Sequence, residues 1–341
     1  MKLLILCQAY NKNHTNLGFF TEWVEGFSKK FENIIVVSRD IEDSSKIKTI
    51  QLDKEGRVLG FRFIYSLWKT LIKERKNYDA IFVHMIPEYA ILAYLPALFL
   101  QKKIFLWYTH GAVSLPLKIS NILVSRIFTA SFDSCRIKSK KVLSVGHGIK
   151  IPFGESSDNL ISKDEIKLVT LGRITKSKSI ETIIESVLEL KQEGKNVSLE
   201  IIGSALSLED VEYKRNLEVK IKSLSLADRV KFIDGVPHEE AISKLKNYDV
   251  FVSASKTGSL DKAVLEALGL GIPVVSTNEA FKYILLPFRL FIEKGDSLAE
   301  GIKRAVSISE TDRVELSKNI EKNHSLDRLI EIISKEIKSV F

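Results

Sequence analysis

The sequence is poor in several residue types that mark particular classes of protein. Its 341 residues include two cysteines, Cys7 and Cys135, together with 7 prolines and 17 glycines. Two cysteines exclude a disulfide scaffold and a zinc ribbon, and fit a reducing compartment. The low proline and glycine content excludes fibrous and low-complexity chains. None of the six histidines has the spacing of a metal-ligand pair, so we expect no metal site and no metal cofactor.

Long hydrophobic runs are also missing. A membrane-spanning helix takes about 20 apolar residues, whereas the longest run here, AILAYLPALFL at 90–100, is expected to form a buried helix. The apolar start, MKLLILC, is too short for a signal peptide core. With 45% hydrophobic and 28% charged residues, the composition is typical of a globular cytoplasmic protein. At about 150 residues per domain, the length predicts two domains.

The net charge of +8 is unevenly distributed along the chain. Residues 1–150 carry 23 Lys and Arg against 12 Asp and Glu, a net charge of +11, while the remainder has 28 basic and 31 acidic residues, a net charge of −3. An excess of one sign in one half indicates an anionic partner for that half. A nucleic acid, an anionic membrane surface and a phosphorylated lipid all fit, and so does a proteome that favours lysine.

Short apolar runs alternate with amphipathic stretches in both halves, which predicts buried parallel strands connected by helices. The first half has expected strands at 2–7, 34–38, 80–84, 104–108, 127–130 and 142–145, and expected helices at 19–31, 58–76 and 115–125. The second half has expected strands at 166–171, 197–202, 230–233, 249–253 and 273–276, and expected helices at 179–192, 208–224, 239–246 and 263–270.

This pattern predicts an α/β protein with two doubly wound, Rossmann-like domains, at 1–150 and 166–324. The polar segment 151–165 is the expected linker, and 325–341 is expected to form a C-terminal amphipathic helix. Ligands of such sheets bind beyond the carboxyl ends of the strands. The loops that follow the strands are therefore where we look for function.

Three loops of the second half follow expected strands. The first, 172–178, reads GRITKSK and leads into a helix, so its two or three cations would form a phosphate cradle at the helix N-terminus. A solvated basic loop is the alternative. Gly203 follows the next strand and would allow a tight turn under a ligand. The loop 235–238, GVPH, presents backbone groups suited to a flat base.

The loop 255–262 and the helix after it carry the strongest signal. Lys262 lies in the first turn of this helix, where a cation opposes the helix dipole and a bound anion would relieve the conflict. Glu266 lies one turn further on the same face, among apolar neighbours, and a buried carboxylate needs a partner. That partner is either Lys262 itself, as a helix pair, or the two hydroxyls of a ribose.

Taken together, these segments resemble the nucleotide-sugar-binding domain of the retaining GT-B glycosyltransferases of family 4, the glycosyl transferases group 1. The matching segments are GRITKSKSIETIIESV, VSLEIIGSA, VKFIDGVP, YDVFVSAS and LDKAVLEALGLGIPVVS, in the family's order over about 166–278. In the first half, NLGFFTEW, LWYTHG and VGHGIK are similar to further segments of the family. The resemblance implies a GT-B fold whose two domains face a central cleft.

The resemblance also implies roles for individual residues. Arg173 and Lys178 would hold the donor diphosphate, Glu266 the ribose hydroxyls, and His110 would line the donor sugar near the reacting carbon, so these four are the expected catalytic residues. The expected donor-binding residues are Gly18, Gly172, Arg173, Lys178, Gly203, Val236, Gly258, Ser259, Leu260, Asp261, Lys262 and Glu266. The family usually needs no metal, and the donor is a substrate, so no cofactor is expected.

One departure from the family pattern concerns the donor sugar. The family commonly has two glutamates separated by seven residues; the second falls on Glu266, and the first would fall on Gly258. Asp261 is the nearest substitute. Ala205 also stands where a second glycine is common after Gly203.

The expected function is therefore transfer of a hexose, with retention, from a nucleotide-diphosphate sugar, expected to be UDP-linked. The acceptor would be a glycan or lipid-linked molecule of bacterial surface polysaccharide synthesis. We expect the basic half to dock peripherally on the inner face of the cytoplasmic membrane. A nucleotide-sugar epimerase of the same fold and a basic nucleic-acid-binding protein are the alternatives, although no nucleic-acid motif is present. A Rossmann dehydrogenase is disfavoured because no Gly-x-Gly-x-x-Gly follows the first strand.

Overall fold

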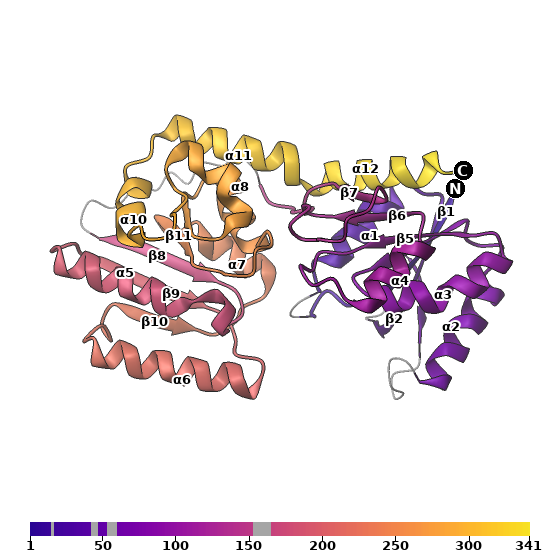
Figure 1. Cartoon of the computed structure of the whole chain (residues 1–341), viewed down its shortest axis with the longest axis horizontal. Helices are drawn as coiled ribbons and strands as arrows, with labels where there is room; N and C mark the ends of the chain where they lie inside the picture. The colour runs from indigo at the N-terminus through magenta and orange to yellow at the C-terminus, as the bar shows by residue number, and fades with distance from the viewer. Residues whose placement is uncertain (15–16, 42–46, 53–59, 153–164) are drawn as a thin grey trace. The chain divides into compact units, whose positions relative to one another are not determined.

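The computed structural model describes residues 1–14, 17–41, 47–52, 60–152 and 165–341. The described chain forms two compact units, one made of 1–148 and 324–341 and the other of 149–323 (Figure 1). The helix expected as a separate C-terminal segment thus belongs to the first unit. Most of the expected linker, 153–164, lies outside the described residues.

A parallel sheet of seven strands, in the order β3-β2-β1-β4-β5-β6-β7, forms the centre of the first unit. Its strands are β1 (Lys2–Tyr10), β2 (Asn33–Ile41), β3 (Lys48–Gln51), β4 (Ala80–His84), β5 (Lys103–Trp107), β6 (Arg126–Thr129) and β7 (Val142–Ser144). The strand order reverses between β1 and β4, which are parallel, and this is the topological switch point of the sheet.

Two layers of helices cover the two faces of this sheet. Leu4, Leu6 and Val83 join α2 (Phe61–Lys73), α3 (Pro87–Phe99) and α4 (Leu115–Leu123) in one core. On the other face, α1 (Phe20–Ser28) packs along α12 (Leu326–Ser339), with the Phe27 ring 5.3 Å from the Phe82 ring of β4. Alternate strand residues therefore serve different cores, which is why the strands are apolar on both faces.

The second unit has a parallel sheet of five strands in the order β10-β9-β8-β11-β12. Its strands are β8 (Ile166–Leu171), β9 (Val197–Ile202), β10 (Val230–Ile233), β11 (Val250–Ser253) and β12 (Val274–Ser276). Its helices are α5 (Ile180–Gln192), α6 (Leu208–Ser223), α7 (His238–Leu245), α8 (Lys262–Gly269), α9 (Lys282–Leu285), α10 (Leu298–Val306) and α11 (Glu310–His324), with 3-10 turns η1 (Lys176–Lys178), η2 (Glu279–Phe281) and η3 (Leu286–Phe288).

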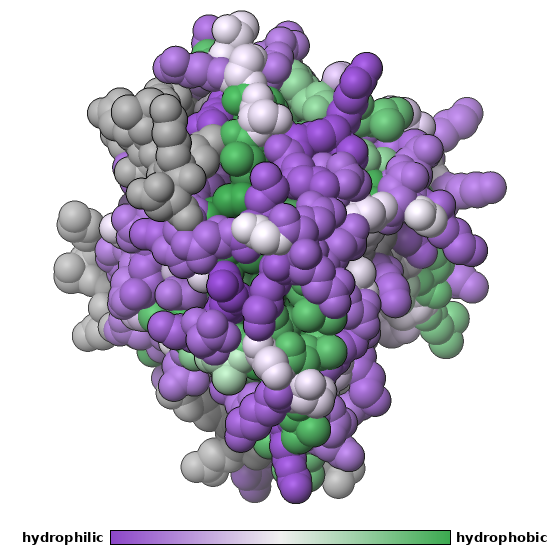
Figure 2. Space-filling view, turned by 90° about the vertical axis from the view of Figure 1, so that its left-hand side faces the viewer, coloured by the Kyte–Doolittle hydropathy of each residue, from purple (hydrophilic) through white to green (hydrophobic). Residues whose placement is uncertain are grey.

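The side that lies on the left in Figure 1 carries mainly hydrophilic side chains, with apolar ones in small groups (Figure 2). Small apolar groups are normal on the surface of a folded protein.

The expected strands at 80–84, 166–171, 197–202 and 230–233 have the predicted bounds. Three expectations need correction. The short polar edge strand β3 was not predicted, nor were α10 and α11. The run 90–100 lies in α3 but is not fully buried, because Leu98 and Phe99 are 54% and 83% exposed. A helix that covers one sheet face has an outer side, and here that side is apolar as well.

Two buried histidines of the first unit lie in surroundings that disfavour their charged form. His84, which ends β4, is 2% exposed and stacks on Phe20 with ring centroids 3.9 Å apart. Burial, and then nearby His147, lower the pKa of His84 to about 3. Burial, then His147 and Arg328, lower the pKa of His324 to about 4. Both rings are therefore neutral in the fold at neutral pH.

These pKa values predict acid-labile packing in the first unit. A histidine in the unfolded chain binds a proton near pH 6.5. The contribution of the neutral, buried rings to the free energy of unfolding is therefore fully present above that pH and decreases as the pH falls towards 4. Each histidine should contribute a slope of about 1.4 kcal/mol per pH unit. Urea unfolding followed by tryptophan fluorescence reports this unit, because Trp23, Trp68 and Trp107 all belong to it. The variant His84→Gln/His324→Gln should show a flatter pH dependence of the unfolding free energy; an unchanged slope would contradict the assignment.

Candidate functional site

The centre of the second sheet defines where a ligand can bind. Strand β8 lies between β9 and β11, and the order of the strands along the sheet reverses there. The loops that leave β8 and β11 therefore flank the switch point, where open parallel sheets bind their ligands. They contain the segments 172–178 and 255–261, most of the two loops that the sequence had indicated at 172–178 and 255–262.

Gly172 and Gly203 allow the ends of β8 and β9 to approach each other closely. Gly172 N donates to Ile202 O at 3.0 Å, and Gly203 has a φ of +157°. A β-carbon on Gly203 would lie 1.8 Å from the carbonyl oxygen of Gly172. Only glycine fits there, and the turns that follow β8 and β9 are therefore packed directly against each other.

Two of the three cations of the first loop, Arg173 and Lys178, differ in their partners. Arg173 is exposed, and among the described residues its guanidinium has no hydrogen bond or ion pair. The ammonium of Lys178 donates to Asp261 Oδ1 at 2.8 Å, with both side chains mostly buried. Lys178 also packs over Gly172, because its Cε would lie 3.7 Å from a β-carbon there. Arg173 is thus available to an anion, whereas Lys178 is already paired.

The loop at 254–261 is tied to its surroundings by backbone and side-chain hydrogen bonds. Lys256 N donates to Ser177 O at 2.8 Å, which joins this loop to the first one. Asn278, which is 1% exposed, donates from Nδ2 to Ser259 O at 2.9 Å. Gly258 has a φ of +64°, a left-handed conformation that a glutamate would adopt only with strain.

Asp261 is not a free substitute for the glutamate that the family commonly has at the position of Gly258. Its Oδ1 is held by Lys178, while Oδ2 is buried and has no hydrogen-bond partner among the described residues. The side chain of Leu260, 7% exposed, packs into the core. Leu260 therefore offers a ligand its backbone and not its side chain.

Glu266 is 3% exposed within α8 and has two partners. His238 Nε2 lies 2.7 Å and Lys262 Nζ 3.4 Å from the same carboxylate oxygen, Oε1. Burial alone would raise the pKa of the Glu266 carboxyl, but the charge of Lys262 and the hydrogen bond with His238 outweigh it, so the pKa lies below its ordinary value. The carboxylate is therefore ionised at neutral pH.

Two residues of this site were not singled out from the sequence. His238 begins α7, two residues after the half-buried Val236, and the contact with Glu266 spans 28 residues of sequence. Ser179 precedes α5 with a φ of +47° and a hydroxyl that is buried without a hydrogen-bond partner in the described chain. A non-glycine residue in this conformation beside a ligand-binding loop is a typical sign of functional strain.

The remaining expected site residues, Gly18 and His110, belong to the first unit. A β-carbon on Gly18 would lie 2.4 Å from Lys12 O, so the loop after β1 needs glycine. His110 follows β5 and is exposed. Met85, which follows β4, has a left-handed φ of +68°, so a strained residue lies at this switch point too. Gly18 and His110 thus lie in loops that follow the carboxyl ends of β1 and β5.

The described residues contain no group of three or more His, Cys, Asp or Glu side chains placed to hold a metal ion. No helix in the same residues is long and apolar enough to cross a membrane.

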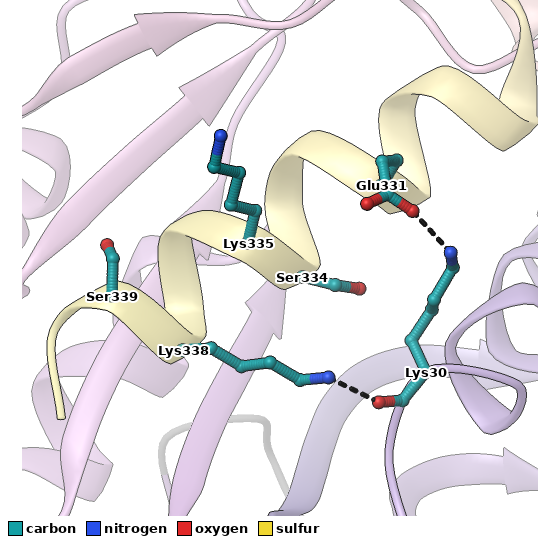
Figure 3. A pocket seen from close by; sticks show the side chains of 6 residues that line it. All are labelled: Lys30, Glu331, Ser334, Lys335, Lys338 and Ser339. Carbon is teal, nitrogen blue, oxygen red and sulfur yellow. Dashed lines mark hydrogen bonds and ion pairs between the residues drawn. The ribbon is translucent and has the colours of Figure 1, made fainter.

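A pocket of about 430 Å³ in the first unit lies away from these loops (Figure 3). Its walls come from α12 and the end of α1, where Lys30 pairs with Glu331 and Lys338 Nζ donates to Lys30 O at 2.8 Å. Because Lys30 lies in the turn between α1 and β2, the pocket is at the amino edge of the sheet. These contacts anchor α12 to α1.

The fold and the loops define a class of protein. Two parallel, doubly wound sheets with alternating helices constitute the GT-B fold class of glycosyltransferases. The crystal structure of Anabaena HepE with UDP-glucose is similar over 99% of this chain and 100% of its own, with a TM-score of 0.78 and 15% identity.

Residues 155–324 match the family described as glycosyl transferases group 1. WcaL of Escherichia coli, named for colanic acid biosynthesis, is 30% identical over 118 residues, which are 33% of this chain and 28% of WcaL. CapJ of Staphylococcus aureus is 22% identical over 312 residues, 80% of this chain and 76% of CapJ. The match to WcaL thus spans less than a third of that relative. These comparisons favour neither an epimerase nor a nucleic-acid-binding protein.

The close approach at Gly203 gives a stability prediction. Gly203→Ala should lower the free energy of unfolding by about 2–4 kcal/mol, because the new methyl group overlaps a carbonyl oxygen in a tightly packed turn. Gly194→Ala is the matched control: Gly194 also has a positive φ, +77°, but a β-carbon there would meet nothing within 4 Å. That control should cost about 1 kcal/mol. Chemical denaturation followed by circular dichroism measures both, and equal losses would show that the close approach is not constrained.

Proposed function

We propose that this protein is a glycosyltransferase that transfers a hexose from a nucleotide-diphosphate sugar, with UDP as the nucleotide. The observation that carries the proposal is the set of residues in the loops and helix that follow β8 and β11: an exposed, uncommitted arginine, a lysine paired with Asp261 and a buried ionised glutamate. Anabaena HepE has been crystallised in complex with UDP and with UDP-glucose. That neighbour supports the choice of nucleotide.

Each charged group has a task in this reaction. Charge develops on the leaving diphosphate as the bond to the sugar breaks, and fixed cations stabilise it. Arg173 would bind the diphosphate with its fork of donors, and Lys178 would share its charge between Asp261 and the ligand. The helix dipole at the N-terminus of α5 would add to the stabilisation of the diphosphate. Glu266 would accept hydrogen bonds from the ribose hydroxyls. Because side chains supply this compensation, we propose that no metal ion is needed.

The acceptor side of the reaction belongs to the first unit in this proposal. His110 would line the donor sugar and Gly18 would let its loop approach the phosphates. We further propose retention of the anomeric configuration and an acceptor that is a glycan or lipid-linked molecule of bacterial surface polysaccharide synthesis. The names of WcaL and of the Erwinia amylovora amylovoran biosynthesis glycosyltransferase AmsK support that acceptor class.

A panel of nucleotide sugars, screened by thermal shift with and without a divalent-metal chelator, tests the function. The correct donor should raise the melting temperature by linkage in both conditions. Arg173→Ala and Glu266→Gln should each weaken donor binding and turnover at least about tenfold, since hydrogen bonds to charged groups are worth about 1.5–3 kcal/mol. Arg173→Lys should recover only part of the loss, because it lacks the fork.

Lys176→Ala is the matched control, because this lysine of the same loop is turned towards Glu209, with the ions 3.1 Å apart. It should leave donor affinity within about twofold. A panel in which no nucleotide sugar stabilises the protein, or a normal Arg173→Ala variant, would contradict the proposal.

A membrane surface is the second partner that we propose. The outward sides of three neighbouring helices, here called the α2–α4 face, expose nine large apolar residues: Phe61, Tyr65, Ile72, Leu95, Leu98, Phe99, Leu115, Ile119 and Ile122. The helices pack side by side, with Trp68 of α2 donating to Leu92 O of α3 and Ser120 of α4 donating to Pro87 O, each at 2.9 Å.

The charges on this face suit an anionic surface. Arg62, Lys69, Lys73 and Lys118 are exposed beside the apolar residues, and Glu88 is the one acidic residue of the three helices. Exposed aromatics flanked by cations are typical of protein surfaces that dock at a lipid interface. In the helix expected at 58–76, only some of the apolar residues are in the core. Phe63, Leu67 and Leu71 are buried, whereas Phe61 and Tyr65 are exposed.

Vesicle sedimentation tests the docking. Binding should increase with anionic lipid content and fade with salt, at about 1 kcal/mol per basic residue near the surface. The double variant Phe61→Ser/Phe99→Ser should lose most of the binding, while Leu208→Ser, a change at a 90% exposed leucine of α6, should not. Equal binding to neutral and anionic vesicles, or equal effects of the two variants, would contradict docking through the α2–α4 face.

A further inference from the structure

The buried carboxylate of Glu266 is held by a side chain from outside its own helix. His238, the first residue of α7, brings Nε2 within 2.7 Å of Glu266 Oε1. The histidine side chain is 34% exposed, whereas that of Glu266 is 4% exposed. The imidazole therefore lies between solvent and the carboxylate, at the carboxyl end of β10, where the strand ends meet the expected ligand.

Charge compensation alone does not explain this contact. Lys262 is one turn away on α8, and its ammonium, 3.4 Å from the same Oε1, already supplies the positive charge. A flexible lysine fixes the position of a carboxylate poorly, because its ammonium is a point charge without a preferred direction. The imidazole N–H is directional and comes from a different helix, so it defines the glutamate rotamer as well as its charge.

We propose that His238 is a positioning residue, which orients the Glu266 carboxylate so that it accepts the vicinal hydroxyls of a nucleotide ribose. This inference rests on the proposed function. Both protein contacts converge on Oε1, and the carboxylate plane is thereby set before the ligand arrives. A glutamate has three side-chain torsions, and fixing them in the fold removes that entropy cost from binding.

The consequence is a specific one: His238 should affect recognition of the ribose hydroxyls and not nucleotide binding in general. The measurable quantity is the ratio of dissociation constants for 2′-deoxy-UDP and UDP, obtained by isothermal titration calorimetry. In the unmodified protein this ratio should be about ten or more, because the analogue cannot make one of the hydrogen bonds to this charged acceptor.

His238→Ala should bring the ratio close to one, mainly by weakening UDP about tenfold while changing 2′-deoxy-UDP by less than about threefold. His238→Gln is the conservative variant, because its terminal amide can donate to the same oxygen, and it should restore most of the ratio. Glu266→Gln should also bring the ratio close to one, and the double variant His238→Ala/Glu266→Gln should lose little more, as expected for residues that act as a unit.

Lys244→Ala, on the same helix and paired with Glu240 at 3.6 Å, is the control for general damage to α7. It should leave both dissociation constants unchanged. A His238→Ala protein that binds both nucleotides equally more weakly, or a glutamine variant that restores nothing, would overturn the positioning role. That result would leave the proposed function intact if Glu266→Gln still abolishes discrimination. Equal binding of the two nucleotides by the unmodified protein would instead remove the assignment of Glu266 itself.

Discussion

The second unit depends on keeping one ionised carboxylate inside an apolar helix. Glu266 lies among Val264, Leu265, Ala267 and Leu268, all of them buried, and an unpaired carboxylate there would be strongly destabilising. Lys262 and His238 remove that penalty, and in doing so they fix the start of α8 and join it to α7. The geometry around the strand ends follows from satisfying this single charge.

The loop at 172–178 also neutralises a mostly buried charge, here a cation instead of a carboxylate. Lys178 is mostly buried at the end of η1 and is held by Asp261 across 83 residues of sequence. Without an anion nearby, the pair keeps the charge of this region balanced, so the fold does not depend on a ligand. Arg173, on the same loop, is exposed and has no ion pair among the described residues. The loop therefore combines a stable structure with one cation that remains available.

Local patterns in the sequence predicted the elements but not the contacts between them. Runs such as Ile166–Leu171 and Val197–Ile202 are apolar on both faces and short, which leaves little choice other than buried parallel strands. The pairing of Lys262 with Glu266 follows from helical spacing alone. Strand β3, KTIQ, is a polar edge strand whose residues carry no such signal, so its place beside β2 became clear only from the structure.

The contacts that complete the site are non-local, which is why sequence reasoning missed them. His238 and Glu266 are 28 residues apart, and no periodicity relates them. Their encounter depends on β10 and β11 lying on opposite sides of the β9–β8 pair and on the helices that follow each strand. The sequence indicated the loop at 235–238 as a place for a ligand, but the function of its last residue depends on the packing of α7 against α8.

The position of Gly258 shows how backbone geometry decides which side chains a site can use. A φ of +64° would strain the backbone of a glutamate at this position. The nearest carboxylate lies three residues later, at Asp261. There, it is no longer free, because one oxygen binds Lys178 while the other is buried. An anion that approaches Lys178 must share the ammonium with Asp261, whereas one that approaches Arg173 meets no competing carboxylate in the described residues. In the proposed diphosphate site, Arg173 is therefore the cation that an anion would meet first, and Lys178 would contribute as its pair with Asp261 loosens.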